Sequence, residues 1–368
     1  MGKICLIYNF AQHYRANIFT LMDQELDCDF VFGDKMSDVK KMDYSLLSQF
    51  RKEVQNRVIL RKPLYFQKGV VSLLKEDYAT YLVLGELFCI STWMILILSG
   101  FYRKRVYLWS HGFYGKEGVF RILLKKLFFS MSAGVFLYGN HARELMIEAG
   151  MNPNKLHVIY NSLDYDGQLG IRGKLFPGKV FMDHFRNRNR NLLFVGRLTR
   201  VKRLDILLEA MLLLKADQHD FNLTIIGEGE KRFELDQLAK AFGLEENIWF
   251  FGACYDEREL SGLIFNADLC VSPGNVGLTA IHAMTYGTPV VTHDCHPLQM
   301  PEFEAIEDGV TGTFFKHMDP GSLAESIKRW FRTAPDRELV RQSCYRTIDE
   351  KYNPHKQIEV LKENLITN

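Results

Sequence analysis

Short apolar runs alternate with helical patterns along the whole chain, and this alternation constrains the fold more than any other feature. Residues 4–8 read as a strand, and residues 17–26 read as the helix that follows it. The same alternation continues with strand-like runs at 30–32, 81–84, 106–109 and 134–138 and helical segments at 119–131 and 142–149. Strands that alternate with helices favour a mostly parallel, doubly wound α/β sheet.

The pattern lapses once and then starts again. Residues 165–190 are rich in glycine, and we interpret them as a linker or irregular segment. A new strand opens at Leu192, and the alternation then continues to about residue 345. A length of 368 residues also favours two domains.

We therefore expect two Rossmann-like domains, at 1–164 and 191–345, that face each other across a cleft. Residues 346–368 are expected to form a C-terminal helix that packs back toward the N-terminal domain. Ligands of such sheets bind beyond the carboxyl ends of the strands, so the loops at those ends are where chemistry is expected.

Charge is distributed unevenly between the two halves. Residues 1–191 hold 27 Lys and Arg against 17 Asp and Glu, whereas residues 192–368 hold 19 against 27. This asymmetry suggests a separate partner for each half. A basic half suits nucleic acid, anionic lipid or a phosphorylated substrate, and charge alone does not choose among them. No aromatic-basic motif typical of nucleic-acid binding is present, so nucleic acid is not expected as a partner.

The seven cysteines include no Cys-x-x-Cys pair. Together with an N-terminus that carries no apolar signal core, this indicates reduced thiols and a cytoplasmic protein. Residues 87–99 are apolar, but they are shorter than the roughly 20 residues that a membrane-spanning helix needs. A buried helix or strand is the better interpretation of that run.

The first candidate site is the segment Gly196-Arg197-Leu198-Thr199-Arg200-Val201-Lys202, which follows a strand and opens a helix. Gly196 permits a sharp turn, and a helix N-terminus favours anions. Arg197 and Lys202 add two positive charges suited to a diphosphate. The alternative for any single lysine is a solvated basic loop. Two cations at one strand-to-helix turn favour phosphate.

The second candidate site is Ser272-Pro273-Gly274-Asn275-Val276-Gly277-Leu278-Thr279, which also follows a strand and leads into a helix. The amides of Gly277, Leu278 and Thr279 have no partner within the helix and are expected to point at an anion. His282 lies one turn further on. The ordinary alternative is a histidine of the core whose ring nitrogens are hydrogen-bonded within the protein.

A resemblance follows from these motifs. The runs FVGRLTRVKRLDILLEAMLLL, LTIIGEGEKRFELDQLAKAFGL and IWFFGACYDERELSGLIFNADLCVSPGNVGLTAIHAMTYGTPVV resemble the donor-binding domain of glycosyltransferase family 4, which contains retaining enzymes of the GT-B fold. The likeness is continuous over residues 192–312. The segment VIYNSLD at 158–164 resembles the turn that closes the N-terminal domain of that family, and the likeness is weak before residue 134.

The resemblance implies roles for residues at the strand ends. Arg197 and Lys202 would grip the donor diphosphate, Gly196 would permit its close approach, and the amides at 277–279 would bind the distal phosphate. The turn at Gly227 and the strand end at Gly252 and Cys254 would border the nucleobase. No metal and no further cofactor are implied.

The chain departs from the family at two positions. The family carries a pair of glutamates eight residues apart, and the aligned positions hold Gly274 and His282. A histidine can still hydrogen-bond a ribose hydroxyl. The candidates to replace the other contact are Asn275, Glu302 and Glu304. The departure indicates either a divergent branch with altered sugar recognition or an enzyme that has lost catalysis. We favour the divergent branch, because Arg197, Lys202 and the phosphate helix are intact.

In the N-terminal half, His111 follows a strand and precedes a glycine. Members of the family often place a histidine there, near the acceptor and the transferring sugar, where it would act as a base or polarise the acceptor hydroxyl. A loop histidine without a role is an equally good interpretation. His13 and Arg15 follow the first strand and are weaker acceptor-side candidates. The Asp27-x-Asp29 pattern matches a metal motif of a different fold and arises often by chance.

The basic residues Arg121, Lys125 and Lys126 lie on an expected helix with Phe120, Leu124, Leu127 and Phe128. Such a helix can rest on an anionic membrane, although a packed helix with solvated lysines is the usual case. The resemblance favours membrane contact, because many relatives elongate lipid-linked glycans at the cytoplasmic face of the membrane.

The resemblance, taken with these features, implies a retaining glycosyltransferase. It would move a sugar from a nucleotide-diphosphate sugar to a glycan or lipid-linked acceptor in capsule, O-antigen or lipopolysaccharide biosynthesis. We expect it in the cytoplasm, with peripheral contact to the inner face of the membrane. Two alternatives remain: a nucleotide-sugar epimerase of the same fold, and an inactive subunit that only binds the nucleotide sugar.

Overall fold

The computed structural model describes residues 2–34, 39–59, 63–333 and 336–366. The chain divides into two compact units. The N-terminal unit contains Met1–Asp164 together with Asn353–Asn368, and the C-terminal unit contains Tyr165–Tyr352.

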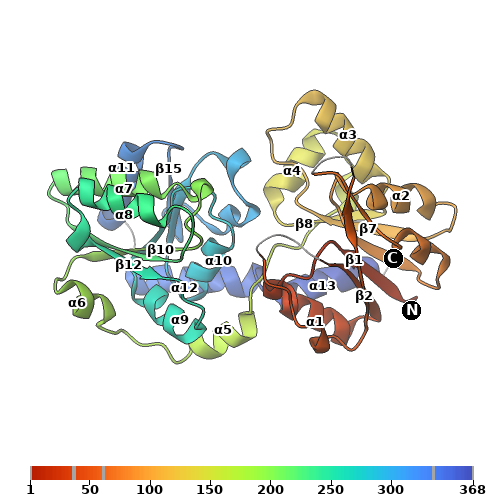
Figure 1. The fold of residues 1–368 in the computed structure, drawn as a ribbon, viewed down its shortest axis with the longest axis horizontal. Helices are drawn as coiled ribbons and strands as arrows, with labels where there is room; N and C mark the ends of the chain where they lie inside the picture. The colour runs from red at the N-terminus through yellow and green to blue at the C-terminus, as the bar shows by residue number, and fades with distance from the viewer. Residues whose placement is uncertain (1, 35–38, 60–62, 334–335, 367–368) are drawn as a thin grey trace. The chain divides into compact units, whose positions relative to one another are not determined.

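The N-terminal unit is built around one seven-stranded parallel sheet (Figure 1). Its strand order is β3-β2-β1-β6-β7-β8-β9, so the chain first moves outward from β1 and then returns to β6 on its other side. The strands are β1 (Ile4–Tyr8), β2 (Cys28–Gly33), β3 (Phe50–Val54), β6 (Thr80–Leu84), β7 (Arg105–Ser110), β8 (Gly134–Leu137) and β9 (Leu156–Val158). A short antiparallel pair, β4 (Asn56–Val58) and β5 (Tyr65–Gln67), lies outside this sheet.

Helices cover both faces of this sheet. They are α1 (Ala16–Glu25), α2 (Ile90–Ser99), α3 (Val119–Ser130), α4 (Asn140–Glu148) and α13 (Pro354–Leu365). Because side chains alternate along a strand, Ile4 and Leu6 of β1 pack with α1 and α13, whereas Cys5 and Ile7 pack with α2, α3 and α4. The apolar run at 87–99 thus contributes α2. Within the described residues, no helix has the length and apolar character to cross a membrane.

The C-terminal unit repeats this plan with a six-stranded parallel sheet of order β12-β11-β10-β13-β14-β15. Its strands are β10 (Arg190–Val195), β11 (Phe221–Ile226), β12 (Ile248–Gly252), β13 (Leu269–Ser272), β14 (Val290–His293) and β15 (Gly312–Phe315). Its helices are α5 (Tyr165–Arg172), α6 (Val180–Phe185), α7 (Leu204–Ala216), α8 (Arg232–Ala241), α9 (Glu257–Asn266), α10 (Leu278–Thr285), α11 (Pro320–Thr333) and α12 (Arg337–Lys351). The doubly wound α/β class expected for both halves is confirmed.

Residues 165–190 differ from the expected irregular linker. They contain α5 and α6, and they belong to the C-terminal unit. Glycines lower the helix propensity of α5, but its Gln168 is buried and donates a 2.9 Å hydrogen bond to Glu257 of α9. Tertiary packing therefore outweighs the local glycine signal.

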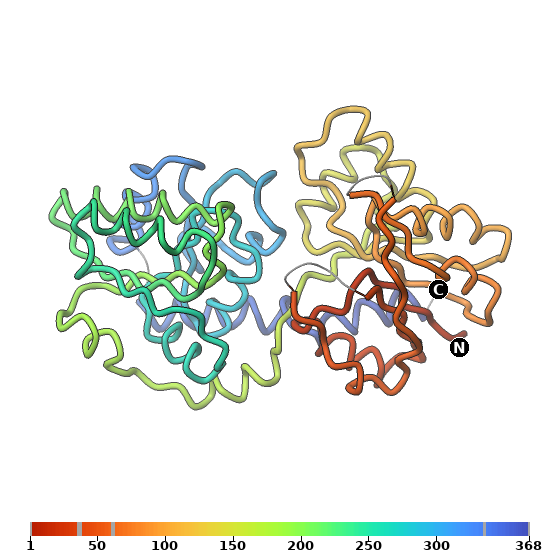
Figure 2. Tube along the Cα trace, viewed as in Figure 1, coloured from red at the N-terminus to blue at the C-terminus, as the bar shows by residue number. Residues whose placement is uncertain are grey.

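The C-terminal segment also differs in its boundary. α12 continues to Lys351 within the C-terminal unit, and a new helix, α13, starts at Pro354. The side chain of Asn353 accepts a hydrogen bond from the amide of Lys356, and proline at the first helical position suits a helix start. α13 packs against α1, and the two helices can be followed side by side in Figures 1 and 2, which are drawn from the same direction.

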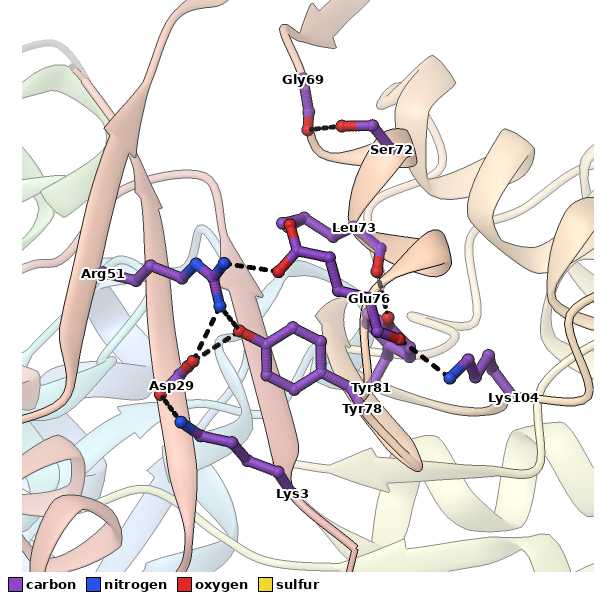
Figure 3. Close-up of polar contacts among 10 residues, drawn as sticks. All are labelled: Lys3, Asp29, Arg51, Gly69, Ser72, Leu73, Glu76, Tyr78, Tyr81 and Lys104. Carbon is purple, nitrogen blue, oxygen red and sulfur yellow. Dashed lines mark hydrogen bonds and ion pairs between the residues drawn. The ribbon is translucent and has the colours of Figure 1, made fainter.

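A cluster of ion pairs lies at the amino ends of the N-terminal strands (Figure 3). The carboxylate of Asp29 contacts Lys3 at 2.7 Å, Arg51 at 3.1 Å and the hydroxyl of Tyr78 at 2.5 Å. Arg51 also pairs with Glu76. Asp29, the second residue of the Asp27-x-Asp29 pattern, is therefore surrounded by cationic and hydroxyl donors.

Candidate functional site

The first candidate site lies where the chain changes direction in the C-terminal sheet, beyond the carboxyl ends of β10 and β13. The loops there are held together through main-chain atoms. Gly196 donates its amide to Ile226 at 3.0 Å, and Gly227 donates to Gly252 at 2.8 Å. A Cβ atom on Gly227 would lie 1.9 Å from the carbonyl oxygen of Gly196, so no side chain fits between these loops.

Lys202 lies in the turn after β10 and reaches the second candidate loop. Its Nζ donates a 2.6 Å hydrogen bond to the carbonyl oxygen of Asn275. Burial lowers the pKa of Lys202 to about 8, with the charge of Arg197 acting in the same direction and that of Glu302 opposing it. Arg197 is exposed and lies one residue beyond Gly196. The structure thus brings both predicted cations to one strand end.

The start of α10 supplies the predicted amides. Gly277 has φ +54° and precedes the helix, so the amides of Leu278 and Thr279 lie in its first turn. The Thr279 hydroxyl donates to the carbonyl oxygen of Val195 at 3.0 Å, which fixes this turn against the end of β10. Asn275 Oδ1 is buried, and it has no hydrogen-bond partner in the part of the chain that the structure describes.

The structure leaves no room for a side chain at position 274. Its amide donates to the carbonyl oxygen of Lys202 at 3.0 Å. A Cβ atom at 274 would lie 2.0 Å from the carbonyl oxygen of Val201 and 2.7 Å from the Cα of Lys202. The turn that carries Lys202 therefore occupies the space that a glutamate side chain would need.

The three suggested replacements for the absent glutamate lie in two segments. Asn275 directly follows Gly274, and Glu302 and Glu304 lie in the short helix Pro301–Ala305. Glu302 is 2% exposed, and its charge acts on Lys202. Glu304 is half-buried. Glu302 is therefore linked electrostatically to the site.

His282 is bound to a carboxylate that the sequence interpretation missed. Its Nε2 lies 2.9 Å from Oε1 of Glu257, the first residue of α9. The hydroxyl of Tyr286 at 2.6 Å and the amide of Gln168 at 2.9 Å also bind this oxygen. Burial alone would raise the pKa of Glu257, but His282 and the other donors lower it to about 2.

A signal for Glu257 was present in the sequence. Asp256 caps α9 by accepting a 2.8 Å hydrogen bond from the amide of Arg258, which places a helix start close to the end of β12. Cys254, in the same loop, is half-buried, and its Sγ lies 3.6 Å from both Asp256 and Glu259. Burial raises the pKa of the Cys254 thiol, so this residue is not an activated thiolate.

A second candidate site lies in the N-terminal unit. A pocket of about 380 Å³ opens beyond the carboxyl ends of β1, β6, β7 and β8. The first two strands flank the point where the strand order reverses, which is where doubly wound sheets bind ligands. Arg15 and His111 both line this pocket. His13 is exposed, contacts the carbonyl oxygen of Lys40, and is not among the lining residues.

His111 follows β7, and its ring lies near those of two tyrosines. Its ring centroid is 4.6 Å from that of Tyr138 and 6.0 Å from that of Tyr114. Burial lowers the pKa of His111 to about 4, and the charges of Arg15 and Lys125 act in the same direction. The imidazole is therefore neutral at pH 7, so one of its ring nitrogens can accept a hydrogen bond.

Helix α3 differs from both sequence interpretations at Lys125, which is not solvated, whereas the burial of Phe128 fits a packed helix. Lys125 and Phe128 are buried, and Lys125 pairs with Glu117 at 2.6 Å and donates to the carbonyl oxygen of Gly112. They face the core together with Phe129, which is also buried and lies one turn after Lys125 and directly after Phe128. The exposed apolar residues of the helix are Val119, Phe120, Leu123 and Leu127.

Comparison with known families concerns mainly the C-terminal unit. Residues 182–347, somewhat less than half of the chain, match the model of the family described as Glycosyl transferases group 1. This segment contains every predicted donor-side residue, from Gly196 to Glu302. The segment is therefore similar to a group 1 glycosyltransferase domain.

Curated relatives match over part of their length. An uncharacterized 41.2 kDa protein in a cps region of Klebsiella pneumoniae is 29% identical over 49% of this chain and 46% of its own length. A D-inositol 3-phosphate glycosyltransferase of Arthrobacter sp. is 35% identical over 36% of this chain and 34% of its own length. The chain thus spans half or less of these two relatives.

Solved structures match the whole chain. Anabaena Alr3699/HepE, in complex with UDP, has a TM-score of 0.74 at 16% identity, and each chain is covered completely. The lipopolysaccharide outer core galactosyltransferase WaaB, in its apo form, has a TM-score of 0.71 at 15% identity over 99% of each chain. At these identities the likeness shows the fold, which is GT-B with two Rossmann-like domains.

Proposed function

We propose that this protein is a retaining glycosyltransferase that takes its sugar from a nucleotide-diphosphate donor. The observation that carries the proposal is the convergence of Lys202, Arg197 and the first amides of α10 at one strand-end turn. Two cations and a helix N-terminus suit a diphosphate, and they would stabilise the negative charge that develops on it as the sugar leaves. The similarity of residues 182–347 to group 1 glycosyltransferases supports this assignment.

The nucleotide would extend from the diphosphate toward α9. There, Glu257 and His282 form a hydrogen-bonded pair, and one oxygen of Glu257 holds His282, Tyr286 and Gln168. A carboxylate held ionised at pH 7 accepts hydrogen bonds from ribose hydroxyls. We propose that this pair takes over the ribose contact of the glutamate that His282 replaces. A solved structure of the same fold contains UDP, so uridine donors are tested first.

The acceptor would bind at the pocket of the N-terminal unit, with the neutral imidazole of His111 near the attacking hydroxyl. We propose a glycan or lipid-linked acceptor in the synthesis of a surface polysaccharide such as capsule or lipopolysaccharide. A relative named for a cps region and a structural neighbour named as a lipopolysaccharide galactosyltransferase support this class. The transfer itself would need neither a metal nor a further cofactor.

We also propose a cytoplasmic protein that touches the membrane through α3. Phe120 is 80% exposed and Leu123 is 60% exposed on this helix, and the exposed cation Arg121 lies between them in sequence. Binding to anionic vesicles should fall when both apolar residues are replaced by serine. Leu213→Ser, at an exposed leucine of α7, is the matched control. Unchanged vesicle binding in the double variant would contradict this contact.

The proposed activity is tested by incubating the protein with a panel of nucleotide-diphosphate sugars and extracted lipid-linked glycans. The anomeric configuration of the product is then read by NMR. Arg197→Ala should reduce transfer by about 10- to 1000-fold, by analogy with the loss of one donor to a developing charge. Inversion at the anomeric carbon would contradict the retaining assignment, and full transfer by Arg197→Ala would contradict the role of the strand-end turn.

Because position 274 has no room for the glutamate side chain of the family, a second candidate function is a subunit that binds the nucleotide sugar without transferring it. That candidate predicts donor binding with no product on any acceptor. Incubation with donor alone tests the further alternative of an epimerase, because a new sugar epimer would form without an acceptor.

A further inference from the structure

Arg15 is a buried cation with unfilled hydrogen-bonding capacity. It is 6% exposed and lines the pocket of the N-terminal unit. Its Nη2 donates a 2.6 Å hydrogen bond to the hydroxyl of Tyr138. Its Nε and Nη1 are buried, and neither has a hydrogen-bond partner among the described residues. An arginine is always charged in a protein, so the pocket lining contains a full positive charge. Most N–H donors of this guanidinium group form no hydrogen bond among the described residues.

Aromatic rings surround this charge instead of carboxylates. The guanidinium carbon lies 5.1 Å from the ring centroid of Tyr138, 5.5 Å from those of Tyr8 and Trp109, and 5.9 Å from that of Tyr14. Cation–π contacts stabilise a cation, but they supply no acceptor for its N–H groups. Burying an ion without a counter-ion is costly, so a site of this kind is incomplete without an anion.

Among the described residues, no carboxylate of this pocket forms an ion pair with Arg15. Glu86 is bound by the hydroxyl of Tyr65 at 2.6 Å and by the amide of Asn9 at 3.3 Å. Lys125 already pairs with Glu117, and Arg121 is a further exposed cation in the lining. Burial is the main cause of the low pKa of His111, and the positive charges of Arg15 and Lys125 act in the same direction. Local charge in this pocket is therefore positive.

We propose that the pocket at the carboxyl ends of the N-terminal strands binds an anionic sugar, with Arg15 as the counter-ion of its carboxylate or phosphate group. The tyrosine rings of the lining would pack against the apolar face of the sugar. That this sugar belongs to the acceptor rests on the function proposed above. Binding of the anion itself does not depend on a donor or on transfer.

The test is calorimetric titration with pairs of sugars in which one member carries a charged group and the other does not. Methyl β-D-glucuronide is compared with neutral methyl β-D-glucoside, and glucose 1-phosphate is compared with glucose. We expect at least one charged sugar to bind about 10- to 100-fold more tightly than its neutral analogue. Preference for the glucuronide alone identifies a sugar-acid carboxylate, and preference for glucose 1-phosphate alone identifies a sugar phosphate.

Variants assign the preference to Arg15. Arg15→Gln should abolish it, whereas Arg15→Lys should keep part of it because the charge remains. Arg57→Gln, which removes an exposed cation of the same unit, should leave it unchanged. If circular dichroism shows that Arg15→Gln does not fold, the reduced preference of Arg15→Lys carries the test.

Three results would overturn the inference: equal affinity for charged and neutral sugars, no binding of either charged sugar, or an unchanged preference in Arg15→Gln. Transfer activity is measured separately on the same preparation. Intact transfer without anion binding would overturn this inference alone. Intact anion binding without transfer would overturn the proposed function alone.

Discussion

The candidate donor site of the C-terminal unit is built mainly from main chain, whereas the pocket of the N-terminal unit is built mainly from side chains. In the first, Gly227 and Gly274 let loops approach so closely that a Cβ atom would overlap a carbonyl oxygen. In the second, Arg15, His111 and tyrosine rings form the wall. Both sites occupy the point where strand order reverses in their own sheet.

The difference teaches how each site would tolerate change. A main-chain site depends on glycines and on amide positions, so it suits a group that many donors share, such as a diphosphate. A side-chain site can be altered one residue at a time without moving its loops, so it suits a ligand that differs among related proteins. Glycine substitutions in the first site should therefore mainly affect folding, whereas side-chain substitutions in the second should change ligand choice as well as stability.

The largest effect is expected from Gly274→Glu, which would restore a carboxylate to the chain. Because a Cβ atom would overlap the carbonyl oxygen of Val201, we expect a loss of more than about 3 kcal/mol in unfolding free energy and no gain in transfer. Urea unfolding followed by tryptophan fluorescence measures the first, and product formation measures the second. A stable variant with faster transfer would show that the turn around Lys202 moves aside.

The second-largest effect is expected from Gly227→Ala. We expect a loss of about 3 kcal/mol in unfolding free energy, because the new Cβ atom would overlap the carbonyl oxygen of Gly196. Gly243→Ala is the matched control. Gly243 also has positive φ, at +62°, but a Cβ atom there would meet nothing within 4 Å. Gly243→Ala should therefore lose only about 1–2 kcal/mol in unfolding free energy, because backbone strain is its only cost. Equal losses in the two variants would mean that close packing of the loops is not what requires glycine.

Lys202 is the side chain on which the main-chain site most depends, and its effect should change with pH. The pKa of about 8 means that Lys202 is protonated below pH 8 and loses its charge as the pH rises above that value. Affinity for pyrophosphate or UDP should therefore fall between pH 8 and pH 9.5.

The control variant is Lys202→Met. At pH 7 it should bind these ligands about 10- to 100-fold more weakly than the unchanged protein, and the difference in affinity between the two proteins should shrink as the pH rises over the same interval. Calorimetric titration at several pH values measures both. A variant that keeps the alkaline decline would assign it to another group.

The main-chain site could largely be predicted from the sequence, because glycines and helix starts leave local signals. Gly196, Lys202 and Gly277 were placed at strand ends by the residues around them, and the structure brings them to one end of one sheet. Two features could not be predicted. The overlap at Gly274 depends on a turn some 70 residues away in the chain, and the carboxylate of Glu257 reaches His282 from a different helix.

The side-chain pocket left weaker signals. Arg15 and His111 were named from their places after strands, but nothing local to Arg15 shows that Tyr138, 123 residues later, supplies its hydrogen-bond acceptor. Lys125 has helical spacing on an amphipathic pattern, which suggested a solvated or membrane-facing residue. Its burial against Glu117 depends on how α3 packs, which no single segment encodes.

The smallest effect, and the sharpest contrast between the two sites, is expected from Tyr138→Phe. This change keeps the aromatic ring beside Arg15 but removes the hydroxyl that accepts from Arg15 at 2.6 Å and contacts the hydroxyl of Tyr8 at 2.8 Å. We expect a loss of about 1–2 kcal/mol in unfolding free energy without ligand. An anionic sugar should recover more stability in this variant than in the unchanged protein, because it would supply the missing acceptor.

Tyr81→Phe is the matched control, since its buried hydroxyl donates to the carbonyl oxygen of Leu73 near the amino ends of the strands (Figure 3). It should lose a similar amount of stability and gain nothing extra from methyl β-D-glucuronide. Urea unfolding with and without this sugar measures both variants. If the sugar stabilises both variants equally, Arg15 does not contact the anion. The aromatic residues around Arg15 would then serve only to pack the core.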